Sequence, residues 1–214
     1  MIDKTNRRPL ASRGTAWART LTQRLAATQI TPNQISQAGM AMAAFSGAAF
    51  WLSGETADAL ARALLLLAAA GFCQLRLLCN LLDGMVAVEA GRSAPDGVFW
   101  NEVPDRVADI LILTGVGYGI GMPALGWAAA AFAVLTAYVR EVGRAEGAGV
   151  DFSGPMAKPH RMAVVTAAAL LSLLEPLWGG KGDVLEIALW IVALGALLTA
   201  LRRARRLVQR LRGR

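Results

Sequence analysis

Two runs of oxygen-bearing side chains in this sequence have the types and spacing of a metal site. Asn80 and Asp83 are three positions apart, and Asn101, Asp105 and Asp109 follow one another at intervals of four. On helices, these intervals place each run on one face. Carboxylate and amide oxygens are the ligands that Mg²⁺ or Mn²⁺ prefers. The sequence has no His or Cys cluster beside them to favour zinc or haem. We therefore expect a divalent-cation site where two helices meet.

The helices that carry these residues also contain long apolar runs, so we expect these helices to cross a membrane. The uncharged stretch between Asp109 and Arg140 contains a glycine and a proline near its middle, so it is too short for two spans of about 20 residues each. One helix must therefore begin around Asn101, and the helix that contains Cys79 must continue toward Asp83. Acidic side chains on spanning helices are costly and normally face a polar cavity. The sequence thus predicts a polar site at membrane depth.

The composition is that of an integral membrane protein. The 214 residues are 55% hydrophobic and 17% charged, with a mean hydropathy of +0.44, whereas soluble domains carry about 25% charged residues. This excludes a disordered chain and argues against nucleic acid as a partner, despite a net charge of +7. Apolar runs separated by Gly and Pro predict an all-α polytopic membrane protein with six transmembrane helices.

Three segments are expected along the chain. Residues 1–30 form a cytoplasmic or interfacial N-terminal segment, in which Leu10 to Ala27 is an amphipathic helix. Residues 31–203 form the six-helix domain, and residues 204–214 form a basic cytoplasmic tail. Most Lys and Arg lie before the first span, in two loops and after the last span, so the positive-inside rule places both termini in the cytoplasm. Richness in Ala, Arg and Leu favours a bacterial inner membrane, with membrane lipids as surroundings.

With these elements in place, the chain resembles the CDP-alcohol phosphatidyltransferase family. That family carries Asp-x-x-Asp-Gly-x-x-Ala-Arg, a short spacer, and Gly-x-x-x-Asp-x-x-x-Asp. The spacing is intact here, and the matching residues are Asp83, Gly84, Ala87, Gly97 and Asp105. A Pro-Asn pair opens the first span of family members, and Pro32-Asn33 matches it. The six-helix layout and the length agree, so the resemblance covers nearly the whole chain.

The resemblance implies a metal-dependent transfer reaction of phospholipid synthesis. In that family two divalent cations, Mg²⁺ or Mn²⁺, bind the diphosphate of a CDP-linked lipid such as CDP-diacylglycerol. The hydroxyl of a polar alcohol attacks the β-phosphorus, and CMP leaves. The metals neutralise the diphosphate charge, and a carboxylate accepts the hydroxyl proton.

The resemblance also assigns residues to these roles. Asp105 matches the base. The metal ligands match Asn80, Asp83, Asn101 and Asp105. The nucleotide is expected against Pro32, Asn33, Asp83, Gly84 and Ala87. Dimers are common in the family, so a homodimer is among the expected partners.

Three positions depart from the family motif. Asn80 and Asn101 stand where the family usually has Asp, and Val88 stands where it has Arg. With two amides in place of two aspartates, only two carboxylates remain to offset the charge of two divalent cations. Three outcomes are open: acidic neighbours restore the charge (Glu102, Glu89 or Asp96), a second ion arrives only with the nucleotide, or catalysis is lost. A working enzyme is favoured because the spacing, the base and the Pro-Asn pair all survive.

Basic residues in the later helices are candidates for binding the acceptor alcohol. Arg140 matches a position where family members often carry Arg, although it also suits a topology anchor. Lys158 and Arg161 open another helix, where anions bind well. If these three converge, a phosphorylated alcohol is the expected acceptor. His160 is expected to be a polar loop residue, and Glu175, placed before Pro176, is expected to reach water.

Other functions fit the sequence less well. A membrane prenyltransferase also uses aspartates and Mg²⁺, but its chain is longer and it has no counterpart to Pro32-Asn33. A transporter would spread its acids through the bilayer, whereas these cluster at one end. A degenerate relative that binds lipid or nucleotide without turnover remains the principal alternative.

Overall fold

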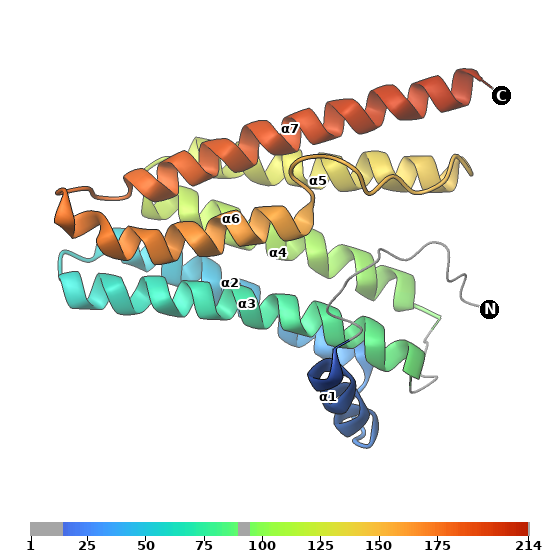
Figure 1. Cartoon of the computed structure of the whole chain (residues 1–214), viewed down its shortest axis with the longest axis horizontal. Coiled ribbons are helices and arrows are strands. Elements are labelled where there is room, and N and C mark those ends of the chain that lie inside the picture. Colours follow the sequence, from blue (N-terminus) through green and yellow to red (C-terminus); the bar gives the residue numbers. More distant parts are fainter. Residues whose placement is uncertain (1–14, 90–94, 214) are drawn as a thin grey trace.

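The described helices form a bundle, with one short helix packed beside a long helix near one end (Figure 1). A computed structural model describes residues 15–89 and 95–213, in which helices are joined by connecting segments and no strand occurs. Figure 1 shows the long helices running side by side. The elements are α1 (Ala16–Ala26), α2 (Pro32–Glu55), α3 (Ala59–Glu89), α4 (Gly97–Gly119), α5 (Pro123–Ala145), α6 (Lys158–Leu171), the 3₁₀ helix η3 (Ser172–Leu177) and α7 (Asp183–Arg212).

Five of these segments are long and apolar enough to cross a membrane: α2, α3, α5, α6 with η3, and α7. The remaining long helix, α4, lies among them and carries the acids that the sequence singled out. As expected, α3 continues past Asp83 to Glu89, and α4 begins one turn before Asn101, at Gly97. The predicted all-α polytopic membrane fold is confirmed.

Glycine allows α4 to lie directly against α2. A Cβ added at Gly115 would lie 2.3 Å from the carbonyl oxygen of Gly47, and one added at Gly119 would lie 2.2 Å from that of Phe50. No side chain fits at these positions, so backbone meets backbone, as in small-residue packing between membrane helices. One side of α4 is therefore fixed by close packing, which leaves the other side for polar contacts.

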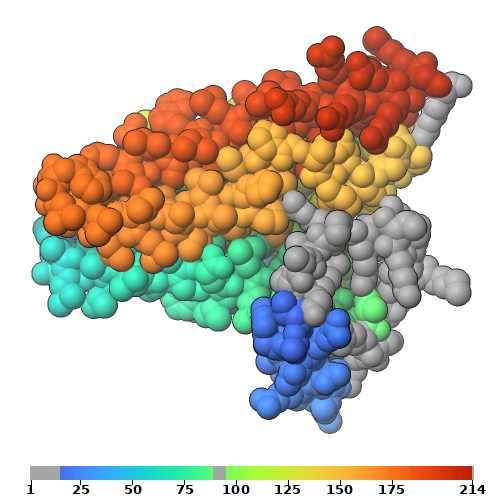
Figure 2. All heavy atoms as spheres, viewed as in Figure 1, coloured from blue at the N-terminus to red at the C-terminus, as the bar shows by residue number. Residues whose placement is uncertain are grey.

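The polar site lies toward the end of the bundle where α2 and α4 begin and where α3, α5 and α7 finish. We call this the polar end. Figure 2 shows α1 and the last turns of α7 on opposite sides of it. The segment 146–157 turns back along α5 before α6 begins (Figure 1). The first residue of α6, Lys158, therefore lies inside the bundle rather than at its rim.

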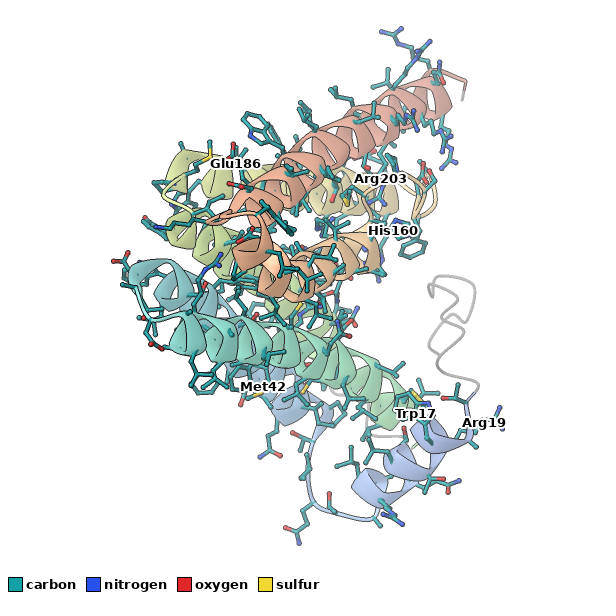
Figure 3. All side chains as sticks on the ribbon, turned by 60° about the vertical axis from the view of Figure 1, so that its left-hand side comes forward. Trp17, Arg19, Met42, His160, Glu186 and Arg203 are labelled. Atoms are coloured by element: carbon teal, nitrogen blue, oxygen red, sulfur yellow. The ribbon has the colours of Figure 1, made fainter. Side chains whose placement is uncertain are left out.

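The described residues near both ends of the chain are helical. The basic segment 204–214, expected as a tail, continues α7 as helix to Arg212. Of the predicted amphipathic helix, the structure describes α1, which packs on α3 through the buried Ala18 and Thr22, and residues 1–14 lie outside the described residues. Arg19 on α1 points away from the bundle (Figure 3).

The expectation that Glu175 reaches water is wrong. Its side chain is fully buried at the opposite end of the bundle and forms an ion pair with Arg62 at 2.5 Å. Its carboxylate also accepts hydrogen bonds of 2.9 Å from the backbone N–H groups of Gly182 and Val184. The chain reverses through η3, so the carboxylate meets the positive N-terminus of α7, a position that favours an anion.

Candidate functional site

Asp105 is the centre of a network that joins three helices. Its Oδ1 accepts hydrogen bonds from Arg76 Nη2 at 2.6 Å and from Asn80 Nδ2 at 3.1 Å, both on α3. The same oxygen forms an ion pair with Lys158 Nζ of α6. Lys158 Nζ also donates to Asn80 Oδ1 at 2.5 Å. The two motif helices, α3 and α4, are thus joined at the predicted residues by a lysine from α6.

Asp83 lies one turn along α3 from Asn80 and is buried. Its Oδ2 accepts a hydrogen bond from Ser36 Oγ of α2 at 2.6 Å, and its Oδ1 accepts one from the N–H of Gly84 at 2.5 Å. Asp83 and Asp105 line one pocket together with Ser36, Gly39, Met40, Arg76, Asn80 and Pro104. Sequence reasoning missed Ser36, although its place one turn after Pro32-Asn33 is a usable signal.

Three acids on α4 are each paired with one of the basic residues expected at the acceptor site. Their spacing, three and then four residues, places Glu102, Asp105 and Asp109 on one side of the helix. The pairs are Glu102 with Arg140, Asp105 with Lys158, and Asp109 with Arg161. The three basic residues therefore gather along one side of α4, from α5 and from α6.

The innermost of these pairs is the most enclosed. Arg161 and Asp109 are both 3% exposed, and Arg161 Nη2 lies 2.5 Å from Asp109 Oδ2. Arg161 Nη1 also donates to the carbonyl oxygen of Met156 at 3.0 Å. Arg161 therefore connects α6 to α4 and to the preceding loop.

The carboxylate of Glu102 contacts residues of α4 and α5 and is not directed at Asp105. It forms ion pairs with Arg106 and Arg140, and it accepts a hydrogen bond of 3.2 Å from Asn101 Nδ2. Asn101 is exposed and, in this arrangement, faces Glu102. Glu102 is one of the acids that could compensate for the missing aspartates, but its carboxylate is paired with two arginines.

The Pro-Asn pair fixes the start of α2 against the start of α4. Pro32 is the first residue of α2, after a capping box formed by Thr31 and Gln34. Asn33 Nδ2 donates to both carboxylate oxygens of Asp96, at 3.3 and 3.2 Å. Asp96 is therefore engaged at the rim of the polar end. Ala87 and the exposed Val88 lie in the last turns of α3, whereas the side chain of Glu89 lies outside the described residues.

A second, basic pocket lies between α5, α7 and the loop that precedes α6. Its lining includes Arg140, Asp151, Arg203 and Arg210. Arg203 is 5% exposed and donates to the carbonyl oxygens of Ser153 and Thr136, at 2.9 and 3.0 Å. Figure 3 shows Arg203 on the side of α7 that faces this loop. The sequence pointed to Arg203 only as one of a run of terminal arginines.

Asp151, in the loop, lines this pocket, whereas His160 lies outside its lining. Partial burial opposes ionisation of Asp151, but hydrogen bonds from Ser153 and the charge of Arg206 outweigh it and hold the pKa of Asp151 below its usual value. His160 is exposed, with Nδ1 3.0 Å from the carbonyl oxygen of Pro155 (Figure 3). It is a polar, exposed residue as expected, but it lies in the first turn of α6 rather than in a loop.

The pocket of Asp83 and Asp105 offers few oxygen ligands for a divalent cation. Among the described residues, no group of three or more His, Cys, Asp or Glu could hold a metal ion. Two carboxylates, Asp83 and Asp105, line the pocket, and Asn80 adds an amide oxygen. With water and phosphate oxygens, two carboxylates form an ordinary Mg²⁺ site. Arg76 and Lys158 both form ion pairs with Asp105, so positive charge already lies beside this carboxylate.

Comparison with known proteins gives two sequence relatives, and no family model matches the chain. Both relatives are named phosphatidylinositol phosphate synthase. The protein of Streptomyces avermitilis is 32% identical over 58% of this chain, and that of Mycolicibacterium smegmatis is 29% identical over 59%. The chain spans only 54% and 59% of the length of these relatives.

Solved structures share the fold over almost the whole chain. Mycobacterium tuberculosis phosphatidylinositol phosphate synthase, in complex with manganese and citrate, has a TM-score of 0.74 at 18% identity, covering 89% of this chain and 88% of the other. The same synthase with CDP-DAG bound has a TM-score of 0.73 at 17% identity, covering 90% and 94%. The helix arrangement is therefore that of this synthase.

Proposed function

We propose that the chain belongs to the CDP-alcohol phosphatidyltransferase family and moves a phosphatidyl group from a CDP-linked lipid to a polar alcohol, releasing CMP. One observation carries this proposal: Asp83 and Asp105, the two surviving motif aspartates, come from different helices and line one pocket. The shared fold and the two synthase relatives support it. The domain proposed to act is residues 31–203.

Asp105 is the proposed base of the transfer. The acceptor oxygen forms a bond to the β-phosphorus, and the bond from that phosphorus to the bridging oxygen breaks. CMP leaves with the bonding electrons, and the hydroxyl proton passes to Asp105. Arg76 and Lys158 bind Oδ1 of Asp105 and so hold the carboxylate in one orientation. A carboxylate fixed within reach of the hydroxyl is what general base catalysis requires.

The CDP-linked lipid is proposed to bind between α2, α3 and α4. The residues proposed to contact the nucleotide are Pro32 and Asn33 at the start of α2, Gly84 and Ala87 in the last turns of α3, and the buried Asp83. The carboxylates that would hold Mg²⁺ or Mn²⁺ are Asp83 and Asp105, with amide oxygens from Asn80 or Asn101. When bound, such a cation neutralises the diphosphate. A CDP-DAG complex and a manganese complex of the structural relative support both assignments.

We propose a phosphorylated alcohol as the acceptor. Arg140 and Arg203 line a basic pocket between α5 and α7, and guanidinium groups bind phosphate through paired hydrogen bonds. Lys158 and Arg161 are bound to Asp105 and Asp109, so they border the transfer site rather than this pocket. The name of the relatives, phosphatidylinositol phosphate synthase, makes inositol phosphate the first acceptor to test.

The proposed location is a bacterial inner membrane, with the polar end and both termini in the cytoplasm. The basic last turns of α7 and Arg24 of α1 support this orientation, because they lie at the polar end. A homodimer in the membrane is part of the same proposal, and nucleic acid is not a proposed partner.

CMP release by the purified full-length protein tests the activity. We expect release from CDP-diacylglycerol with Mg²⁺ or Mn²⁺ and a phosphorylated alcohol, little with the unphosphorylated alcohol, and none with a chelator. Isothermal titration with CDP-diacylglycerol is run on the same preparation. Binding without CMP release for any acceptor would replace the enzyme with a non-catalytic CDP-lipid-binding protein, which Asn80 and Asn101 make the second candidate.

A further inference from the structure

We propose that Lys158 takes the place of one of the two divalent cations, so that the site works with a single metal ion and a fixed ammonium group. This rests on the proposed transferase function. The observations that carry it are the contacts of Lys158, the charges around Asp105 and a guanidinium nitrogen without a partner.

The Lys158 ammonium touches two positions of the metal-binding motif at once. Its Nζ donates to Asn80 Oδ1 at 2.5 Å and pairs with Asp105. These are the first and last oxygen-bearing positions of the motif, one on α3 and one on α4. A cation that bridged the two helices here would contact the same two side chains. The ammonium therefore occupies the place of such a bridging ion.

The identity of Asn80 agrees with a lysine rather than a metal at this place. An amide supplies one neutral oxygen, which suits a hydrogen bond from an ammonium group. A divalent ion in a low-dielectric site needs carboxylates to offset its charge. Asp83 and Asp105 bring two negative charges, and Arg76 and Lys158 bring two positive ones, so the site is neutral before any metal binds. One divalent ion can be offset by the substrate diphosphate, whereas a second would have no carboxylate of its own.

Arg76 adds a second fixed cation directed at the same pocket. It is 2% exposed, and its Nη2 donates to Asp105 at 2.6 Å. Its Nη1 is buried without a hydrogen-bond partner in the described part of the chain. Buried guanidinium nitrogens are normally satisfied, and Arg76 lines the pocket of Asp83 and Asp105. A diphosphate oxygen is the acceptor that this nitrogen lacks.

The start of α6 strengthens the same positive field. Lys158 is the first residue of a helix of 14 residues, and the positive end of a helix attracts anions. Because the segment 146–157 turns back before α6 begins, this helix end lies inside the bundle beside Asp105 (Figure 1). The ammonium, the guanidinium and the helix end therefore all act on one substrate group.

Counting bound manganese tests the proposal directly. Mn²⁺ is titrated into the detergent-purified full-length protein with saturating CDP-diacylglycerol, and free Mn²⁺ is measured by electron paramagnetic resonance. We expect one Mn²⁺ per chain. The double variant Asn80→Asp/Lys158→Gln returns a carboxylate and removes the ammonium, and its stoichiometry is expected to double. Lys181→Gln, which changes an exposed lysine at the opposite end, is the control and is expected to leave one ion.

The outcomes separate this proposal from the function on which it rests. Two ions per wild-type chain, or one ion per chain in a double variant that still binds CDP-diacylglycerol, would overturn the role of Lys158. If the double variant does not bind that lipid, the wild-type count alone decides. Failure of the wild-type protein to release CMP would overturn the transferase proposal instead, whatever the manganese count.

Discussion

At the scale of single residues, the candidate site is organised around one aspartate, which makes three contacts through a single oxygen. Oδ1 of Asp105 accepts hydrogen bonds from Arg76 and Asn80 and forms an ion pair with Lys158. Such sharing fixes the carboxylate firmly and places two positive groups within reach of any phosphate that comes near. Asp105 can therefore act as an anchor for the cations and as the acceptor of a proton.

Changing Asp105 to Asn tests its assignment as the base. The amide retains the size of the side chain but cannot accept the hydroxyl proton, so CMP release should fall by about 10²–10⁴-fold. The lipid should still bind, because Arg76 and Lys158 remain. Asp58→Asn is the matched control, since Asn can replace Asp58 as the helix cap that binds the N–H of Ala61. Undiminished turnover in a folded Asp105→Asn protein would remove Asp105 as the base.

Arg161 is expected to act on stability more than on the acceptor. Arg161→Met leaves Asp109 buried without its partner, which should cost about 3–5 kcal/mol of unfolding free energy. The double variant Asp109→Leu/Arg161→Met removes both charges and should regain most of that loss. Thermal unfolding of both proteins in detergent measures the difference. Equal destabilisation of the single and double variants would show that the ion pair is not the cause.

At the scale of elements, α4 is held from two sides by different forces. Glycines let its backbone lie against α2, and ion pairs connect its acids to α5 and α6. The position of Asp105 therefore depends on packing at a distance from the pocket. A change on the glycine side should move the acids on the other side.

Gly115→Ala tests this dependence. The added Cβ would lie 2.3 Å from the Gly47 carbonyl oxygen, so α2 and α4 must separate, at a cost of about 1–3 kcal/mol typical of overpacking. Both the Tm and CMP release should fall. Gly71→Ala is the matched control, because a Cβ there meets nothing within 4 Å, and alanine favours the helix by up to about 1 kcal/mol. Equal Tm values for the two variants would contradict the close-packing argument.

The sequence predicted the elements of this site better than its contacts. Extension of α3 to Asp83 and of α4 back past Asn101 followed from the length that a membrane span requires. The partners of those residues could not be predicted, because Lys158 and Asn80 are 78 positions apart and Arg161 and Asp109 are 52 apart. The burial of Glu175 could not be predicted for the same reason, because it depends on how η3 reverses the chain.

At the scale of the whole molecule, positive charge distinguishes one end of the bundle from the other. We expect a cysteine introduced at Gln209, on the basic part of α7, to react with an impermeant maleimide only after the cells are opened. A cysteine at Asp58, in the α2–α3 connection, should react in intact cells. Both are placed in a background without Cys73 and Cys79. The opposite labelling pattern would reverse the proposed orientation.

The ion pair between Asp109 and Arg161 also bears on how the protein is assembled during synthesis. The chain emerges from its N-terminus, so α4 reaches the membrane before α6 exists. At that moment Asp109 has no counter-charge, and an unpaired acid in the bilayer is costly. Insertion of α4 therefore becomes more favourable when the later helix arrives with Arg161. The two halves of the bundle stabilise each other in the lipid through this ion pair.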